Sequence, residues 1–274
     1  MSTILIGTSG YSYTDWIGPV YRKGTKQEDF LIQYARMFPT VELNFSYYRM
    51  PEATYLEAMH KKAPMLQFSI KAHQSLTHTI DPVSWKDQAT LFCRALEPLV
   101  ENKVLSAVLL QFPFSFHYEI AERKYLDALL KTLRSFPVAV EFRNSHWYNN
   151  RTLDSLRERN VTLASLDLPS VKGNPPMMDI KTSNSLAYLR FHGRNEETWW
   201  GSDSASRYDY LYTKKELSNL LERIRLFAKN IEKVIIYFNN HHRGQAVANA
   251  LMLYQMAEGG GLCAHPGQVS SISM

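Results

Sequence analysis

The sequence predicts a single α/β domain with the fold of a (β/α)8 TIM barrel, a closed ring of eight parallel strands. Three observations predict it. Short apolar runs of strand length recur along the chain, helix-like stretches lie between most of them, and polar residues alternate with apolar ones late in these runs. The chain has 274 residues, which suits one barrel because such domains commonly have about 250.

The predicted strands are rich in β-branched and aromatic residues, as buried parallel strands are. In chain order they are Ile4–Ser9, Thr40–Tyr47, Leu66–Ala72, Ser106–Phe112, Val138–Arg143, Thr162–Leu168, Ala187–His192 and Lys233–Asn239.

The stretches between them carry apolar residues three and four positions apart, which indicates amphipathic helices. They are Asp29–Phe38, Ala53–Lys62, Ser84–Val100, Ala121–Ser135, Leu153–Asn160, Lys214–Asn230 and Gln245–Met256. Strands that alternate with helices indicate parallel βαβ units, and this number of units favours a closed barrel over an open doubly wound sheet. An open sheet would usually have a glycine-rich turn after its first strand, and Gly7-Thr8-Ser9-Gly10 is too short for that motif.

One unit of the pattern is incomplete. The stretch from Leu168 to Ser185 contains Pro169, Pro175 and Pro176, which predicts a loop and a weak or missing sixth helix. We expect one barrel domain over residues 1–258 and an irregular C-terminal tail over residues 259–274, which begins in a run of glycines.

The composition indicates which cellular location and which class of binding partner to expect. A formal charge of +5 and a pI of about 9.0 favour anionic partners, among them nucleic acid. The two cysteines, Cys93 and Cys263, make neither a disulfide framework nor a metal knuckle. No signal peptide and no membrane span are expected, because the N-terminus lacks a basic region and no long apolar stretch occurs. The expected location is cytoplasmic, and the oligomeric state is left open.

Alternate residues of a strand face opposite sides, so residue parity predicts what enters the barrel. In most strands the polar residues share one parity, and the apolar set must face the outer helices. The polar set is therefore expected to face the lumen near the carboxyl ends of the strands, where barrel active sites lie. This set consists of Glu42, Asn44, Gln67, Ser69, Lys71, His73, Gln111, Glu141, Arg143, Ser165, Asp167, Tyr188, Arg190, His192, Tyr237 and Asn239.

Two interpretations of this polar set were weighed. Buried charges need partners, so the set forms either a ligand pocket or a structural ion-pair network that fills the lumen. The number of strands involved favours a pocket. Lys71, Arg143 and Arg190, with Arg194 in the following loop, suit an anionic ligand such as a carboxylate or phosphate.

A series of short motifs runs in order through almost the whole chain. It consists of Gly7-Thr8-Ser9-Gly10-Tyr11-Ser12-Tyr13 with Trp16, Val41-Glu42-Leu43-Asn44 with Tyr47-Tyr48-Arg49-Met50-Pro51, Phe68-Ser69-Ile70-Lys71 with Thr77-His78, Gln111-Phe112-Pro113, Val140-Glu141-Phe142-Arg143 with Trp147, Arg190-Phe191-His192-Gly193-Arg194, and Tyr237-Phe238-Asn239-Asn240 with Gly244, Ala246 and Asn249. The series resembles the YecE-like family, catalogued as domain of unknown function 72. The resemblance implies a TIM barrel and implies no reaction. Tyr11 stands where much of that family is expected to have tryptophan.

Three residues are candidates for catalysis. Glu141 and Asp167 lie late on neighbouring strands, where two carboxylates could act as acid and base or bind a metal with His73 or His192. The alternative is that they only pair with the arginines. Lys71 could form a Schiff base, hold a phosphate, or pair with Glu42, and pairing is favoured at this stage.

Histidines and aromatic residues supply further candidates. His73, His78, His192, His241 and His242 show no metal-binding spacing, so neither a metal nor a cofactor is expected. Aromatic residues at a barrel mouth can stack on sugar rings or bases, or can simply cap the core. This group contains Tyr11, Tyr13, Trp16, Tyr47, Tyr48, Trp147, Trp199 and Trp200.

The loop after the last strand, Asn239–Gly244, leads into a helix and could hold an anion on its backbone N–H groups, with Arg194 and Arg243 nearby. The alternative is an ordinary polar helix start.

The leading hypothesis is an enzyme, of hydrolase or lyase type and without an obligatory cofactor, that acts on a phosphorylated or sugar-containing anion at the barrel mouth. A nucleic-acid-directed phosphodiesterase or binder and a non-catalytic metabolite-binding barrel are the alternatives. The expected catalytic residues are Glu141, Asp167 and Lys71, and the expected substrate contacts are Glu42, Asn44, His73, Arg143, Arg190, His192, Arg194, Tyr237, Asn239, Tyr11 and Trp16.

Overall fold

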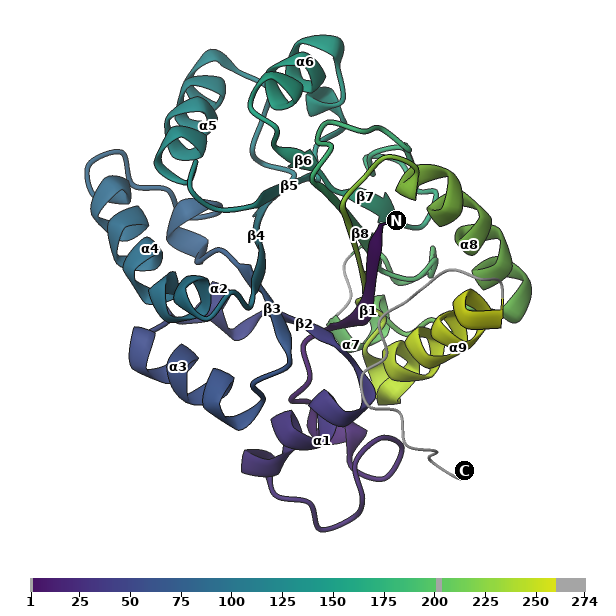
Figure 1. Cartoon of the computed structure of the whole chain (residues 1–274). Helices are drawn as coiled ribbons and strands as arrows, with labels where there is room; N and C mark the ends of the chain where they lie inside the picture. Colours follow the sequence, from purple (N-terminus) through teal and green to yellow (C-terminus); the bar gives the residue numbers. More distant parts are fainter. Residues whose placement is uncertain (1, 201–203, 260–274) are drawn as a thin grey trace.

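The strands form a ring with the helices around its outside (Figure 1), in a computed structural model that describes residues 2–200 and 204–259. All paired strands are parallel, in the order β6-β5-β4-β3-β2-β1-β9-β8-β7. The strands are β1 (Thr3–Ser9), β2 (Thr40–Leu43), β3 (Gln67–Lys71), β4 (Leu105–Phe112), β5 (Val138–Phe142), β6 (Thr162–Leu163), β7 (Ser165–Asp167), β8 (Leu186–Phe191) and β9 (Lys233–Phe238). The predicted parallel α/β barrel is confirmed.

The nine described strands correspond to the eight predicted ones, because the sixth is interrupted at Ala164. Its first part, β6, pairs with β5, and its second part, β7, pairs with β8. The Ala164 N–H still donates to the Val140 carbonyl at 2.8 Å. One continuous stretch of chain therefore nearly closes the ring.

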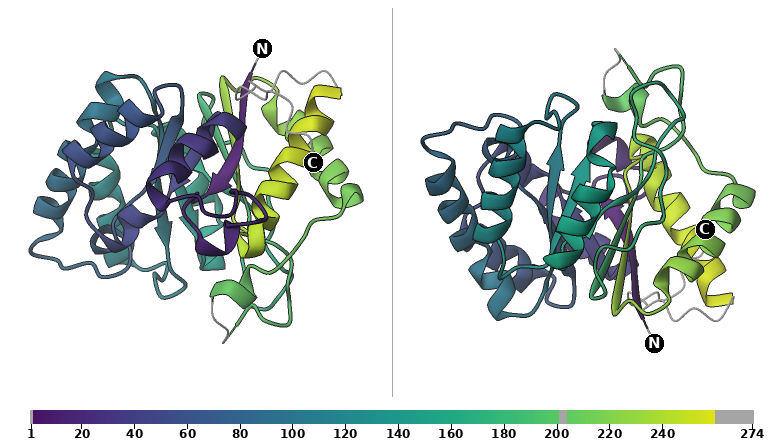
Figure 2. Two further views of the ribbon diagram at one scale, coloured as in Figure 1. Left: turned by 90° about the horizontal axis from the view of Figure 1, so that it is seen from below. Right: turned by 90° about the horizontal axis from the view of Figure 1, so that it is seen from above.

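The helices pack outside the ring, and the side views place α7 beyond the carboxyl ends of the strands, opposite the N-terminus (Figure 2). The helices are α1 (Phe30–Met37), α2 (Phe45–Tyr48), α3 (Ala53–Lys62), α4 (Trp85–Glu101), α5 (Ile120–Thr132), α6 (Asn150–Glu158), α7 (Ser204–Arg207), α8 (Lys214–Ala228) and α9 (Gln245–Gly259). Residues 168–185 contain no helix, so the prediction of a missing sixth helix is confirmed. Of the tail predicted at 259–274, Gly259 ends α9 and the rest lies outside the described residues. No helix among the described residues is long and apolar enough to cross a membrane.

Two apolar clusters divide the barrel into an outer layer and an inner one. The outer cluster lies between strands and helices and includes Phe68, Leu110 and Phe238. The smaller inner cluster includes Leu5, Leu109 and Ile235. On several strands its members precede the polar lumen residues, as Leu109 precedes Gln111 and Ala139 precedes Glu141. Apolar side chains thus fill the amino-terminal part of the lumen, and polar side chains fill the part near the mouth.

Strand two is shorter than predicted. It ends at Leu43, and the chain makes the helical turn α2 instead of continuing to Tyr47. Ser46 Oγ stabilises the turn by donating to the Lys71 carbonyl at 2.6 Å and the Leu43 carbonyl at 3.1 Å. The turn brings the Tyr47 ring over Lys71 at the end of β3, with the Lys71 Nζ 4.3 Å from the ring centre.

The parity predicted for strand six is wrong. Leu166 belongs to the inner apolar cluster and pairs in register with Arg190, whereas Asp167 pairs with Phe191 of the outer cluster. Ser165 and Asp167 therefore face outward. Polar residues are tolerated there because they have partners: Ser165 Oγ donates to the Met178 carbonyl at 3.3 Å, and Asp167 accepts from Arg194 and Tyr212.

Gly7 lies where β1 passes close to β2. A Cβ atom at this position would stand 2.1 Å from the Thr40 carbonyl oxygen, which is backbone and cannot rotate away. We expect Gly7→Ala to lower the free energy of unfolding by about 1–3 kcal/mol, the usual cost of forcing extra volume into a packed site. Urea unfolding measures it. The matched control is Gly259→Ala, where nothing lies within 4 Å of the added carbon; equal stability of the two variants would contradict the account.

Candidate functional site

A cavity of about 610 Å³ opens at the carboxyl ends of the strands. Polar side chains from the strands form its base, and aromatic side chains from the loops form its wall. The lining residues are Gly10, Tyr11, Ser12, Tyr13, Gln27, Leu43, Asn44, Phe45, Tyr47, Tyr48, Tyr55, Lys71, Gln111, Arg143, Arg190, Tyr208, Asn239 and His241.

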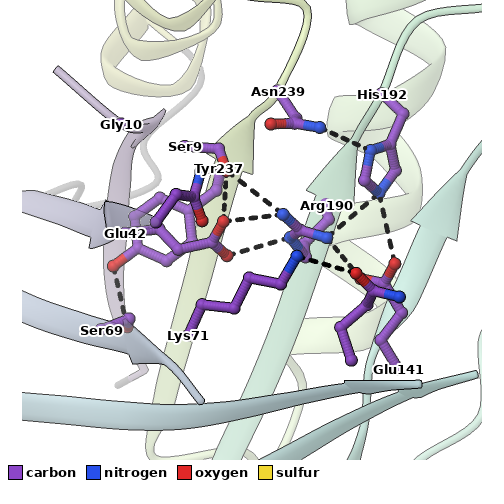
Figure 3. Close-up of polar contacts among 12 residues, drawn as sticks. Ser9, Gly10, Glu42, Ser69, Lys71, Glu141, Arg190, His192, Tyr237 and Asn239 are labelled. Atoms are coloured by element: carbon purple, nitrogen blue, oxygen red, sulfur yellow. Dashed lines mark hydrogen bonds and ion pairs between the residues drawn. The ribbon is translucent and has the colours of Figure 1, made fainter. Parts of the chain in front are cut away.

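Arg190 bridges two buried carboxylates at the base of this cavity (Figure 3). Its Nε and Nη2 donate to the two oxygens of Glu42 at 2.9 and 2.7 Å, and its Nη1 donates to Glu141 Oε2 at 2.6 Å. The Arg190 side chain is 3% exposed and both carboxylates are 0% exposed. Burial alone would lower the pKa of Arg190, but Glu141 and Glu42 raise it well above its usual value. The Arg190 guanidinium is therefore charged throughout the physiological range.

Glu42 has donors on both oxygens besides Arg190. The Ser9 hydroxyl donates to one oxygen, and the Tyr188 hydroxyl donates to the other at 2.7 Å. Below it the Tyr237 hydroxyl donates to Ser69 Oγ at 2.9 Å and contacts Thr40 Oγ1 at 2.6 Å. Glu42 and Tyr237 are both 0% exposed, so they support the base of the cavity from below it.

Glu141 is held as a carboxylate. Burial alone would raise the pKa of Glu141, but the guanidinium groups of Arg143 and Arg190 together lower it well below its usual range. Arg143 Nε lies 2.7 Å from Glu141 Oε1 as an ion pair, and that oxygen still accepts no aligned hydrogen bond among the described residues. A general acid needs a raised pKa near the working pH. Glu141 thus anchors the two arginines, and its geometry does not support the predicted acid role.

Lys71 is the cation in the lumen that has no carboxylate partner. Its Nζ donates to Gln111 Oε1 at 2.8 Å and lies over the Tyr47 ring. No ion pair joins it to a carboxylate in the described part of the chain. Burial lowers the pKa of Lys71 to about 8, and the positive charge of Arg190 adds to the shift. Pairing with Glu42, which the sequence favoured, is wrong because Arg190, Ser9 and Tyr188 already surround that carboxylate.

His192 is fully buried behind Arg143. Its Nδ1 lies 2.9 Å from the Asn239 side-chain nitrogen, and its Nε2 lies 3.4 Å from Arg143 Nη2. Burial, together with Arg143 and Arg190, lowers the pKa of His192 well below its usual value. The ring is neutral and orients Arg143 and Asn239 rather than contributing charge.

The aromatic wall consists mainly of tyrosines. Tyr13 stacks on His241 with ring centres 4.6 Å apart and 5° between the planes. Trp16 lies beneath this pair, 0% exposed, and its Nε1 donates to the His241 carbonyl at 2.7 Å. Of the two aromatic residues predicted to contact substrate, Tyr11 lines the cavity, whereas Trp16 is a core residue that supports the wall and does not line the cavity. Trp147 is likewise buried in the core, stacked on Phe142.

Asp167 and Arg194 lie outside the cavity. Arg194 donates to the Asp167 carboxylate at 3.0–3.1 Å, and the Tyr212 hydroxyl donates to the same carboxylate at 2.6 Å. Arg194 also pairs with Glu216 at 3.2 Å. The group is on the outward face of β7, so Asp167 does not converge with Glu141, and Arg194 does not join the lumen cations. The predicted pair of neighbouring carboxylates is wrong.

Two other predicted contacts are placed elsewhere. His73 lies two residues after β3, where its Nδ1 accepts from the Ser75 backbone N–H at 3.2 Å and caps the next turn, outside the cavity lining. In the loop after β9, the Arg243 N–H donates to Asp15 Oδ2 at 2.6 Å. The predicted anion position on that loop is therefore already filled by a carboxylate of this chain.

The predicted site residues thus fall into three groups. Asn44, Lys71, Arg143, Arg190, Asn239 and Tyr11 line the cavity; Glu42, Glu141, His192 and Tyr237 are buried behind it; Asp167, Arg194, His73 and Trp16 lie elsewhere. Across residues 2–200 and 204–259, no three His, Cys, Asp or Glu side chains are arranged to hold a metal ion.

Some residues of the site were not predicted as contacts. Ser9 has the parity of the lumen set on β1, which was a usable signal. His78 reaches the site from a loop, with its ring 4.8 Å from the Tyr47 ring, and burial followed by the charge of Lys71 lowers its pKa to about 4. Tyr208 comes from the segment around α7. No pattern in the sequence gives the position of such loop residues.

Comparison with known proteins places the chain in a family. The family model described as "Protein of unknown function DUF72" matches residues 5–268. The chain is 27% identical over 270 residues to UPF0759 protein YunF of Bacillus subtilis (strain 168), covering 93% of this chain and 95% of the relative.

Solved structures agree with that match. A DUF72 family protein from Thermotoga maritima MSB8 is 37% identical, with a TM-score of 0.83, and the match covers 93% of this chain and 99% of that one. A DUF72 family protein from Enterococcus faecalis V583 is 27% identical, with a TM-score of 0.83, and the match covers 93% and 96%. The chain belongs to the DUF72 family.

Proposed function

We propose that this protein is an enzyme that acts on a small anionic substrate in the cavity at the barrel mouth. The observation that carries the proposal is the pair of cations, Lys71 and Arg143, at one aromatic-walled cavity of about 610 Å³. A cavity of this size accepts a small molecule, and convergent polar groups at its base are typical of a binding site.

Arg143 is the group best placed to hold the anion. Its Nε pairs with Glu141 and its Nη2 contacts His192, which leaves Nη1 without a hydrogen bond among the described residues. The side chain is 17% exposed, on the cavity side. A guanidinium fixed by a buried carboxylate is preorganised to bind a carboxylate or a phosphate.

Neutral groups at the base complete the recognition. Asn44 Oδ1 is buried and has no donor among the described residues, and Gln111, whose Oε1 accepts from Lys71, lines the cavity. A substrate hydroxyl could donate to Asn44, and a substrate oxygen could accept from Gln111. The tyrosine wall suits the C–H face of a sugar ring or a planar aromatic ring. A phosphorylated or sugar-containing anion therefore remains our proposal for the substrate class, with Lys71 as the reacting group.

Arg143→Gln is expected to weaken anion binding by about 10- to 100-fold, because a hydrogen bond to a charged group contributes about 1.5–3 kcal/mol. Calorimetric titration with phosphate esters and carboxylates measures it. The matched control is Arg194→Gln, which removes a guanidinium paired with Asp167 outside the cavity. The proposal would be contradicted if both substitutions weakened anion binding equally, or if no anion bound the wild-type protein.

Turnover separates an enzyme from a non-catalytic binder. The enzyme converts the bound anion, whereas a binder releases it unaltered after prolonged incubation. The nucleic-acid alternative stays a prediction. It requires an affinity for DNA or RNA that falls as the salt concentration rises.

A further inference from the structure

We propose that Lys71 forms a Schiff base with the carbonyl group of an anionic oxo compound bound in the barrel-mouth cavity. The inference rests on the proposed function and specifies its substrate class, a carbonyl compound that carries a carboxylate or phosphate. Two observations support it: Lys71 is the lumen cation that can become neutral, and its amine lies at the cavity.

The lumen has three cations and two carboxylates within reach of one another: Lys71, Arg143 and Arg190 against Glu42 and Glu141. Arg190 joins both carboxylates, and Arg143 pairs with Glu141. The surplus positive charge therefore rests on Lys71. Arginine stays protonated in proteins, whereas lysine gives up its proton when it is desolvated. Lys71 is thus the lumen cation that can become a neutral amine.

The position of Lys71 suits attack on a bound carbonyl. It is the last residue of β3 and lines the cavity. Within residues 2–200 and 204–259 its Nζ has a single hydrogen-bond acceptor, Gln111 Oε1, and the Tyr47 ring covers one side. A neutral amine can keep that hydrogen bond and still turn its lone pair toward the cavity. The pKa of about 8 leaves part of the population neutral near pH 7.

The step is balanced without a cofactor. The neutral Nζ adds to the carbonyl carbon, and a proton moves from nitrogen to the new alkoxide. The hydroxyl then leaves as water, with a second proton, while the nitrogen lone pair forms the C=N bond. One amine and one carbonyl give one imine and one water. Protonation of the imine keeps a cation beside Gln111 and Tyr47 and turns the group into an electron sink for cleavage or proton transfer at the adjacent carbon.

The test traps the imine. The full-length protein is incubated with sodium cyanoborohydride and pyruvate, dihydroxyacetone phosphate, or the neutral ketone hydroxyacetone, and modified peptides are mapped by mass spectrometry. Formaldehyde with the same reductant reports the reactivity of each lysine without need of the proposed substrate. Lys233 is an internal control, because burial also lowers its pKa but it lies at the amino end of β9, away from the cavity.

We expect Lys71 to be labelled at least tenfold faster than Lys233 and the surface lysines, by formaldehyde and by at least one anionic probe. The rate should reach half its maximum near pH 8. Lys71→Arg should abolish the label, and Arg143→Gln should reduce labelling by the anionic probe but not by formaldehyde.

The outcomes separate this inference from the proposed function. If an anionic probe binds, with Arg143-dependent affinity, and no reagent labels Lys71 preferentially, the Schiff base is wrong and the proposed anion site stands. If Lys71 is labelled and hydroxyacetone reacts as fast as the anionic probes, the Schiff base stands and the anionic substrate class is wrong. Labelling spread evenly over the lysines with every reagent overturns the inference.

Discussion

Arg190→Met is expected to lower the free energy of unfolding by about 3–5 kcal/mol, because removing one partner of a buried ion pair leaves the other charge uncompensated. Here two carboxylates would lose their bridge, Glu42 and Glu141, each 0% exposed. Urea unfolding followed by circular dichroism measures the change.

The control for this substitution is Arg157→Met. Arg157 pairs with Asp154 at 2.8 Å on the surface, with side chains 48% and 64% exposed. Exposed pairs contribute about 0–1 kcal/mol, so this variant should stay close to the wild type. If Arg190→Met is no more harmful than Arg157→Met, the bridge does not hold the lumen together.

Lys71→Met should change how stability depends on pH, by up to about 3 kcal/mol. The folded-state pKa of Lys71 is lowered from 10.5 to about 8 by burial, with a contribution from Arg190. The unfolded chain therefore binds more protons between these two values. Wild-type stability is reduced in full below about pH 8, and the penalty is relieved as the pH rises toward 10.5.

The methionine variant lacks this term, so its advantage over the wild type should be largest below pH 8 and should disappear by pH 10.5. Unfolding titrations of both proteins across that range measure the difference. Lys23→Met, which removes an exposed lysine, should keep the wild-type profile. A constant difference between Lys71→Met and wild type at every pH would show that Lys71 titrates normally.

The charged residues at the centre of the site could be predicted from the sequence, because side chains alternate regularly between the two faces of a parallel strand. Glu42, Lys71, Glu141 and Arg190 occur at alternate positions against apolar neighbours, and the structure brings all four to one level of the lumen. The alternation is reliable where a helix covers the outer face of the strand, since the outward residues must then be apolar.

The same reasoning failed for Asp167 because a loop without a helix, residues 168–185, follows β7. Polar residues could face outward there, with Arg194 and Tyr212 as partners. The three prolines after this strand already predicted that gap, so the exception had a signal in the sequence. The loop contributions had none. Tyr47 reaches Lys71 through a helical turn where the composition predicted continued strand, and Trp16 is buried by loops whose course no periodicity describes.

The sequence could not predict which charged side chains pair with one another in the lumen. From the sequence, pairing of Lys71 with Glu42 was favoured over a Schiff base or a contact with phosphate. The bidentate geometry of Arg190 places that guanidinium on Glu42 instead, and Lys71 is left with an amide. A lysine in a barrel lumen is a structural cation when it pairs with a buried carboxylate. It can be a reactive amine when an arginine occupies that carboxylate instead, as Arg190 does here.

The most direct measurement is an NMR titration of the Lys71 amine in protein labelled with ¹³C at lysine Cε, with the signal assigned by its absence in Lys71→Arg. A midpoint near pH 8 is the predicted result, and it would establish a lysine in the cavity that is partly neutral under physiological conditions. A midpoint at or above 10.5 would contradict the account, because Lys71 would then be a permanently charged structural cation.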